Sequence, residues 1–353
     1  MKILLLSPYD AMSHRYWREG LVNQFPEHEF TVLALPDRHF SWRFRGNSLT
    51  LAHDVRIHKE FDLILATSMT DLSSLKGMAP SLSLIPTIVY FHENQFAYPE
   101  GRHVKDTGRA LERQVTSLYT ALAADRLVFN SAYNRDTFLA GARGFLKQMP
   151  DQVPTGIVET IEVRSRVLPV PLAEDCFGGF TAPGPRRKLR LVWNHRWEYD
   201  KGPALLLEII EGLIAIDFDF ECHLLGQQFR DAPREFERCV RVLRAAGCLG
   251  KVGFLKRPEY LATLRSSDVV LSTALHEFQG LSVLEAMACG CSPIVPDRLV
   301  YPELIDASCR YRSASTAVQL IGKHSIGNVR PDVHHFAWPA QRDAWVDVLK
   351  FSS

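Results

Sequence analysis

The chain has 353 residues, a formal net charge of +1 and 46% apolar residues. This length favours two domains, and the near-neutral charge excludes a global field that would attract nucleic acid or a membrane. Any site for a polyanion must therefore be a local patch. Seven scattered cysteines without a C-x-x-C pair favour reduced thiols and predict a cytoplasmic protein. We expect no signal peptide, because the apolar run at the N-terminus is short and runs directly into Pro8. We expect no membrane span, because no apolar run approaches ~18 residues.

Apolar and amphipathic segments alternate along the first half of the chain. Strands are predicted at residues 2–7, 30–35, 63–67, 87–91 and 126–130. Helices are predicted from the loop after the first strand to about residue 24, at 107–124, and after Ser131, which we interpret as an N-cap. Such alternation predicts a parallel, doubly wound sheet.

A stretch rich in proline, glycine and basic residues separates the two halves, and we interpret residues 173–188 as a linker. The second half repeats the alternation, with strands predicted at 189–194, 220–225, 252–255, 268–272 and 292–296. The predicted organisation is a first domain at 1–172, a second domain at 189–335 and a C-terminal helical segment at 336–353.

Polar side chains follow several predicted strands of the first half. His92 comes directly after a strand, with Glu93, Asn94 and Gln95 beside it, and Ser13 and His14 lie in the first strand–helix loop. The carboxyl edge of a parallel sheet is where such folds bind ligands. A structural, satisfied histidine is the alternative for His92.

Residues 35–47 form a basic and aromatic loop in this interpretation. Arg38, Arg43 and Arg45 interleave with aromatic side chains that include Trp42. Aromatic faces stack on exposed bases while arginines hold phosphates, so this loop is a candidate nucleic-acid surface. An aromatic lid or packing between domains is the alternative.

Two cations follow the first strand of the second half. Arg196 provides a planar fork and Lys201 a point charge, which together could stabilise a departing diphosphate without a metal ion. The alternative is two solvated loop cations.

The segment 273–296 combines a loop with a helix that starts beside Gly280. Amides at a helix N-terminus suit phosphates, so those of Gly280 and Leu281 could hold a diphosphate. A hydroxyl-rich ring would lie on each side of the diphosphate, and Glu277 and Glu285 could each accept hydrogen bonds from the hydroxyls of one ring. The alternative is a capping box from Ser282 to Glu285 with a solvated Glu277.

The E-x7-E pattern at 277–285 and the R-x4-K-G pattern at 196–202 resemble those of the GT4 family of retaining glycosyltransferases, which have the GT-B fold. The resemblance implies two Rossmann-like domains facing a cleft, with the last helix crossing back to the first domain. It implies that His92, Glu277, Arg196 and Lys201 are catalytic and that no metal or other cofactor is needed. The donor-binding residues would be Arg196, Lys201, Glu277, Gly280, Leu281 and Glu285.

Residues 13–14, 35–47 and 90–99 are together similar to the tRNA-queuosine mannosyltransferase family. This resemblance implies GDP-mannose as donor and queuosine at the wobble position of a tRNA as acceptor. The acceptor-binding residues would be Ser13, His14, Arg38, Trp42, Arg43, Arg45, Glu93, Asn94 and Gln95. One alternative is a related glycosyltransferase with a glycan, lipid or small-metabolite acceptor, and another is a non-catalytic protein that binds tRNA or a nucleotide sugar. The sugar, the nucleobase and the oligomeric state stay open.

Overall fold

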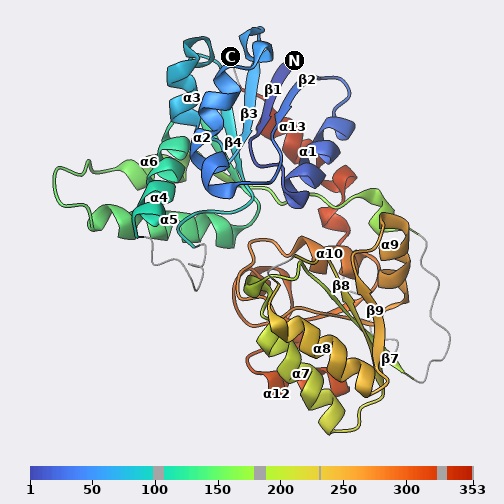
Figure 1. The fold of residues 1–353 in the computed structure, drawn as a ribbon. Helices are drawn as coiled ribbons and strands as arrows, with labels where there is room; N and C mark the ends of the chain where they lie inside the picture. Colours follow the sequence, from blue (N-terminus) through green and yellow to red (C-terminus); the bar gives the residue numbers. More distant parts are fainter. Residues whose placement is uncertain (98–106, 179–187, 230–231, 324–331, 352–353) are drawn as a thin grey trace. The chain divides into compact units, whose positions relative to one another are not determined.

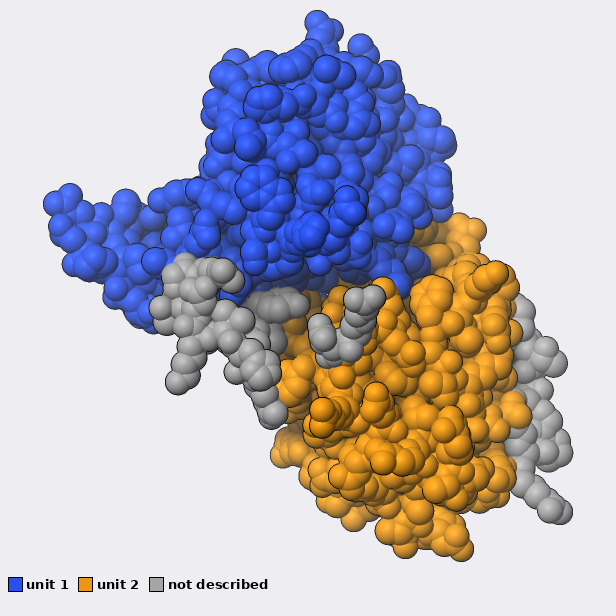
Figure 2. Space-filling model, viewed as in Figure 1, with its two compact units in different colours: residues 1–171, 341–353 blue, residues 172–340 orange. Residues whose placement is uncertain are grey.

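The computed structural model describes residues 1–97, 107–178, 188–229, 232–323 and 332–351. It divides the chain into two compact units, Met1–Pro171 with Gln341–Ser353, and Leu172–Ala340 (Figures 1 and 2). Part of the expected linker, residues 179–187, lies outside the described residues, as do Tyr98 and Pro99 of the segment 90–99. In the part of the chain that the structure describes, no helix is both long and apolar enough to cross a bilayer.

Unit 1 is built on a six-stranded sheet whose neighbouring strands all pair in parallel. Its strands are β1 (Lys2–Ser7), β2 (Glu29–Ala34), β3 (Leu63–Thr67), β4 (Thr87–Phe91), β5 (Arg126–Phe129) and β6 (Ser165–Val167), in the order β2-β1-β3-β4-β5-β6. β3 and β4 are buried along their whole length, as expected of central parallel strands with helices on both faces. The predicted parallel α/β architecture is confirmed.

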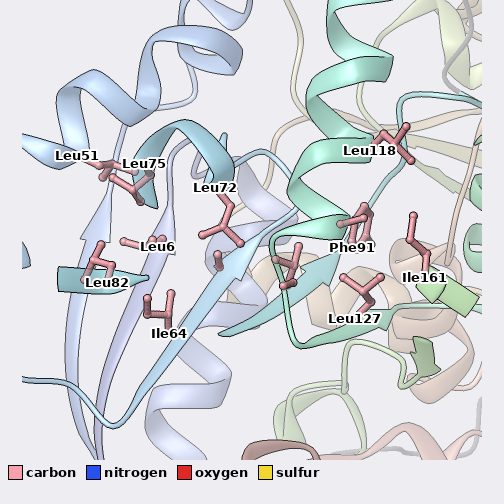
Figure 3. Packing of buried hydrophobic residues seen from close by; sticks show 14 of the residues in the cluster. Leu6, Leu51, Ile64, Leu72, Leu75, Leu82, Phe91, Leu118, Leu127 and Ile161 are labelled. Carbon is pink, nitrogen blue, oxygen red and sulfur yellow. The ribbon is translucent and has the colours of Figure 1, made fainter. Parts of the chain in front are cut away.

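Helices cover both faces of this sheet. The unit contains α1 (Met12–Gln24), α2 (Phe40–Ala52), α3 (Leu72–Met78), α4 (Thr107–Leu122), α5 (Ala132–Lys147), α6 (Ile157–Val163) and the greater part of α13 (Trp338–Leu349). Leu6, Ile64 and Phe91 of the strands pack with apolar residues of α2 to α6 (Figure 3). On the other face, Trp17 of α1 stacks on Tyr90 and lies 5.9 Å from the Trp345 ring of α13. The last helix therefore packs on the first domain, as the resemblance implied.

Unit 2 has a second six-stranded parallel sheet. Its strands are β7 (Leu189–Asn194), β8 (Phe220–Leu225), β9 (Leu249–Gly253), β10 (Val269–Leu271), β11 (Ser292–Pro296) and β12 (Arg310–Tyr311). Its helices are α7 (Pro203–Ala215), α8 (Arg234–Ala245), α9 (Arg257–Ser266), α10 (Leu281–Ala288), α11 (Tyr301–Leu304) and α12 (Ala314–Lys323). Trp193 and Phe220 of the sheet join a buried core with Phe236 of α8.

The strand order β12-β11-β10-β7-β8-β9 reverses between β7 and β10. In unit 1, the order reverses in the same way between β1 and β3. Ligands of doubly wound sheets bind at such switch points, outside the carboxyl ends of the strands. The loops that follow these four strands are therefore the places to look for a site.

The prediction that residues 35–47 form a loop is wrong from Phe40 onward, because this part is the first half of α2. His39, in a left-handed conformation with φ of 56°, directly precedes the helix. Phe44 is buried, and the Phe40 and Tyr9 ring centroids lie 5.4 Å apart. This aromatic packing stabilises the helix, whereas the arginines in the sequence had suggested an exposed loop. Tertiary burial of one face outweighs the weak helix propensity of aromatic residues here.

Candidate functional site

The loops after β7 and β10 are tied together at the switch point of unit 2. Thr273 Oγ1 donates to the Lys201 carbonyl at 2.7 Å, and the Leu275 amide donates to the Asp200 carbonyl at 2.8 Å. Gly202 adopts φ of +65°, and a Cβ there would lie only 2.0 Å from the Thr273 carbonyl oxygen. Glycine is therefore required for this close approach.

These tied loops bring Lys201 and Glu277 together. Lys201 Nζ lies 3.3 Å from Glu277 Oε2 and 3.0 Å from Asp200 Oδ2, and it donates to the His276 carbonyl at 3.0 Å. Burial lowers the pKa of Lys201, but the two carboxylates raise it further than burial lowers it. Burial raises the pKa of Glu277, yet Lys201, His195 and the Gly280 amide bring it down to about 2. Both partners are charged at neutral pH.

We expect the Glu277 carboxylate to make stability depend on pH. Its pKa in the folded protein lies below the ordinary 4.5, so its contribution is present above that pH and is lost as pH falls toward 2. The melting temperature of wild type should therefore approach that of a Glu277→Gln variant between about pH 5 and pH 3. A difference that stays constant over this range would contradict the assignment.

Arg196 is exposed and pairs with Glu198, with 2.9 Å between Nη2 and Oε2. Its charge also helps to lower the pKa of His195, after burial and Lys201. The structure thus places Arg196 in the electrostatic neighbourhood of the Lys201–Glu277 pair.

Helix α10 begins directly beside this pair. Gly280, with φ of +73°, is its N-cap and Leu281 its first residue. The alternative capping box is not formed, because Ser282 lies inside the helix and its Oγ contacts His195 Nδ1 at 3.1 Å. The first amides of α10 therefore lie close to a buried lysine, a combination that suits an anion.

Glu285 is held by two residues that the sequence did not single out. Arg257 Nη1 lies 2.6 Å from Glu285 Oε1, and the Tyr260 hydroxyl donates to Oε2 at 3.1 Å. Arg257 also pairs with Asp175 at 2.6 Å. Only the three-residue spacing of Arg257 and Tyr260, which places both on one side of α9, could have indicated them.

His14, His92 and Glu93 meet at the carboxyl edge of the unit 1 sheet, next to its switch point. His14 follows β1, whereas His92 and Glu93 follow β4. The His14 and His92 rings stack with centroids 4.2 Å apart, and His14 Nε2 lies 3.1 Å from Glu93 Oε2. Burial and the neighbouring His14 hold the pKa of His92 well below its ordinary value, so His92 is neutral. The prediction that Ser13 and His14 lie in the strand–helix loop is wrong, because α1 already begins at Met12 and both residues are on its first turn. The Ser13 side chain is exposed.

Asn94 is buried and its amide is used within the protein. Its nitrogen donates to Asn134 Oδ1 at 2.9 Å, and its oxygen accepts from the amides of Phe96 and Ala97. These bonds shape the loop after β4. Gln95, next along the chain, is half-buried.

The basic and aromatic residues of α2 do not share one side. Trp42 and Arg45 are exposed and three residues apart, so they lie on one side of the helix. Arg43 is rotated about 100° around the helix axis from Trp42 and lies on another side. Arg45 contacts the Asp71 carboxylate and lies 3.2 Å from Glu112. Arg38, just before the helix, is exposed as well.

In the described ranges, no group of three or more His, Cys, Asp or Glu side chains is arranged to hold a metal ion. The polar groups at the two sheet edges are instead cations, carboxylates and the neutral imidazoles of His92 and His195. They can bind hydroxyls and an anionic phosphate group.

Comparison with solved structures shows the fold, and a family model shows the class of protein. Sucrose-phosphate synthase from Thermosynechococcus elongatus has a TM-score of 0.67 at 13% identity, covering 98% of this chain and 97% of that one. Anabaena HepE in complex with UDP and glucose has a TM-score of 0.63 at 14% identity, covering 91% and 89%. Residues 188–315 match the family model for glycosyl transferases group 1. The chain is a glycosyltransferase with the GT-B fold.

Residues 2–172 match the model of the N-terminal domain of tRNA-queuosine alpha-mannosyltransferases. The tRNA-queuosine alpha-mannosyltransferase of Drosophila melanogaster is 36% identical over 321 residues, which are 89% of this chain and 84% of that protein. The chain belongs to the tRNA-queuosine alpha-mannosyltransferase family.

Proposed function

We propose that this protein transfers mannose from GDP-mannose to queuosine in tRNA, with retention of the anomeric configuration and without a metal ion. The observation that carries the proposal is the Lys201–Glu277 pair beside the first turn of α10, in a chain of this family. The pair places a buried cation, a carboxylate and helix amides at one switch point. These are the groups that a nucleoside diphosphate sugar requires.

In this proposal the diphosphate binds the Leu281 amide and shares the Gly280 amide with the Glu277 carboxylate, while Lys201 and Arg196 supply positive charge. Charge that develops on the leaving diphosphate is stabilised by groups already in place, which is an effective form of catalysis. Glu277 accepts hydroxyls of the sugar. The UDP complex of Anabaena HepE supports the class of ligand, and guanine is our proposal for the base.

Glu285 would accept the ribose hydroxyls. Its two oxygens already receive hydrogen bonds from Arg257 and Tyr260, and each carboxylate oxygen can accept more than one donor. The two partners orient the carboxylate.

The acceptor would bind at the switch point of unit 1. His92 is neutral, so it can exchange a hydrogen bond with a hydroxyl without carrying a charge. In front-face transfer, the leaving phosphate accepts the proton of the acceptor hydroxyl. Ser13, His14, Glu93 and Gln95 are proposed contacts of the acceptor, and Asn94 shapes their loop.

The exposed side of α2 is proposed to contact the tRNA. Arg45→Ala should reduce the slope of log Kd against log salt by about 1, because one phosphate contact is lost. Trp42→Ala should weaken binding by about 1–3 kcal/mol with the slope unchanged, because stacking is insensitive to salt. Filter binding across a salt series measures both effects.

Arg238→Ala is the matched control, since Arg238 is 58% exposed and paired with Glu211, and Arg45 is 51% exposed and also ion-paired. Equal effects of the Arg45 and Arg238 substitutions would remove α2 from the acceptor surface.

The function is tested by incubating the protein with a panel of nucleotide sugars and with total tRNA that contains or lacks queuosine. Nucleoside mass spectrometry should detect one added hexose on queuosine only, and only with GDP-mannose. Transfer of a hexose from a different nucleotide sugar would show that the proposed donor, GDP-mannose, is wrong. Slow donor hydrolysis without a tRNA product would favour the alternative of a different acceptor.

We further propose a cytoplasmic location, where tRNA is available. The seven cysteines all lie within the described residues and none is joined in a disulfide there, which agrees with a reducing compartment.

A further inference from the structure

His195 is a buried histidine at the switch point of unit 2. It directly follows β7 and is 4% exposed, with its ring 5.1 Å from that of Trp193. Its main chain is fixed as well, because a Cβ on Gly226 would lie 1.9 Å from the His195 carbonyl oxygen. The residue is held rigidly beside the proposed diphosphate site.

The His195 side chain is directed at Ser282, the second residue of α10. His195 Nδ1 lies 3.1 Å from Ser282 Oγ, and the neighbouring Asn194 donates from Nδ2 to the Ser282 carbonyl at 2.8 Å. Two consecutive residues at the end of β7 therefore hold both the hydroxyl and the main chain of Ser282. A serine that served only as a surface residue of the helix would need neither contact.

The state of the His195 ring follows from its surroundings. Burial and the nearby Lys201 charge lower the pKa of His195 to about 4, so the ring is neutral and carries a single N–H at neutral pH. His195 Nε2 is buried and has no hydrogen-bond partner within the described residues. An unpaired buried N–H is rarer in proteins than an unpaired acceptor, so the proton belongs on Nδ1.

With the proton on Nδ1, His195 donates to Ser282 Oγ. The Ser282 hydroxyl proton must then be directed elsewhere, and in the described ranges Ser282 Oγ has no partner besides His195. Ser282 is half-exposed in the first turn of an eight-residue helix, and the His195 ring that it contacts lies within the electrostatic influence of Lys201 and Glu277. The hydroxyl proton thus faces a position where helix amides and a buried cation favour an anion.

We propose that the Ser282 hydroxyl donates a hydrogen bond to a diphosphate oxygen of the bound nucleotide sugar, and that His195 is the positioning residue that directs this hydroxyl. The inference rests on the proposed donor site. It adds a side-chain contact to the amide contacts, and it gives the buried His195 a role through its Nδ1.

The test is calorimetric titration of the full chain with GDP, with UDP as a second probe and guanosine as a probe that lacks phosphate. Ser282→Ala should weaken GDP binding about 10- to 100-fold, which is the usual contribution of a hydrogen bond to a charged group. Guanosine binding should not change. Ser315→Ala is the matched control, because Ser315 is likewise the second residue of a helix, α12, and is exposed.

Substitutions of His195 separate positioning from mere packing. An asparagine amide nitrogen reaches the place of Nδ1, whereas that of glutamine reaches the place of Nε2. His195→Asn should keep GDP affinity within about 3-fold, and His195→Gln should lose as much as Ser282→Ala, with no further loss in the double variant. Thermal melting checks that each variant is folded. If His195→Gln does not fold, Ser282→Ala still tests the proposal, because it removes only one oxygen atom.

The two failures can be told apart. If wild type binds neither GDP nor UDP, the proposed donor site is wrong and this inference falls with it. If wild type binds GDP and Ser282→Ala binds it equally tightly, the donor site stands and the role of Ser282 and His195 is overturned.

Discussion

Replacement of Glu277 by alanine should reduce kcat/KM for sugar transfer about 1,000-fold, the size of effect seen when a preorganised electrostatic group is removed from a transition state. The carboxylate is ionised at neutral pH, since its pKa is about 2, and it fixes Lys201 Nζ at 3.3 Å. Its loss removes the proposed contact to the sugar and one of the partners that fix the lysine ammonium. Single-turnover transfer to queuosine-containing tRNA measures the effect.

Binding of tRNA should be unaffected by Glu277→Ala, because the proposed acceptor residues belong to unit 1. Lys201 keeps Asp200 as a partner at 3.0 Å, so the substitution should not leave an unpaired buried charge. Glu211→Ala, which removes an exposed carboxylate of the same unit, is the control. Transfer by Glu277→Ala within about 10-fold of wild type would show that the carboxylate has no part in the reaction.

Substitution of Gly202 by alanine should lower the free energy of unfolding by about 3 kcal/mol. The left-handed backbone conformation should cost alanine about 1 kcal/mol, and the steric overlap of the new Cβ about 2 kcal/mol. The contact is severe because the Thr273 carbonyl oxygen lies 2.0 Å from the position of the new Cβ. Relief requires the loops after β7 and β10 to separate, which displaces Lys201 from Glu277. We therefore expect GDP affinity to fall together with stability.

Gly247→Ala is the matched control for this prediction. Gly247 has φ of +69°, close to the +65° of Gly202, but a Cβ there would meet no atom within 4 Å. Its cost should be only the backbone contribution, about 1 kcal/mol, with nucleotide binding unchanged. Urea unfolding of both variants measures the difference, and equal costs would mean that the contact with Thr273 is readily relieved.

Local patterns in the sequence determined much of the fold. The apolar runs at β1, β3 and β4 are buried strands because a parallel strand covered on both faces must be apolar throughout. The glycine at 280 marked the start of α10, because the left-handed conformation that it adopts favours glycine. The family patterns likewise pointed to Lys201 and Glu277, which the structure shows in contact, and their role in donor binding stays a prediction.

The sequence could not show which distant residues meet. Lys201 and Glu277 are 76 residues apart and meet because β7 and β10 lie side by side at a switch point. His14 and Glu93 are 79 residues apart and meet across the carboxyl end of β3, which lies between β1 and β4. The contacts of Arg257 with Glu285, and of His195 with Ser282, depend on the same strand order. Such pairings are decided by tertiary structure, because hydrogen bonds and ion pairs act over a few ångströms in space, whatever the separation along the chain.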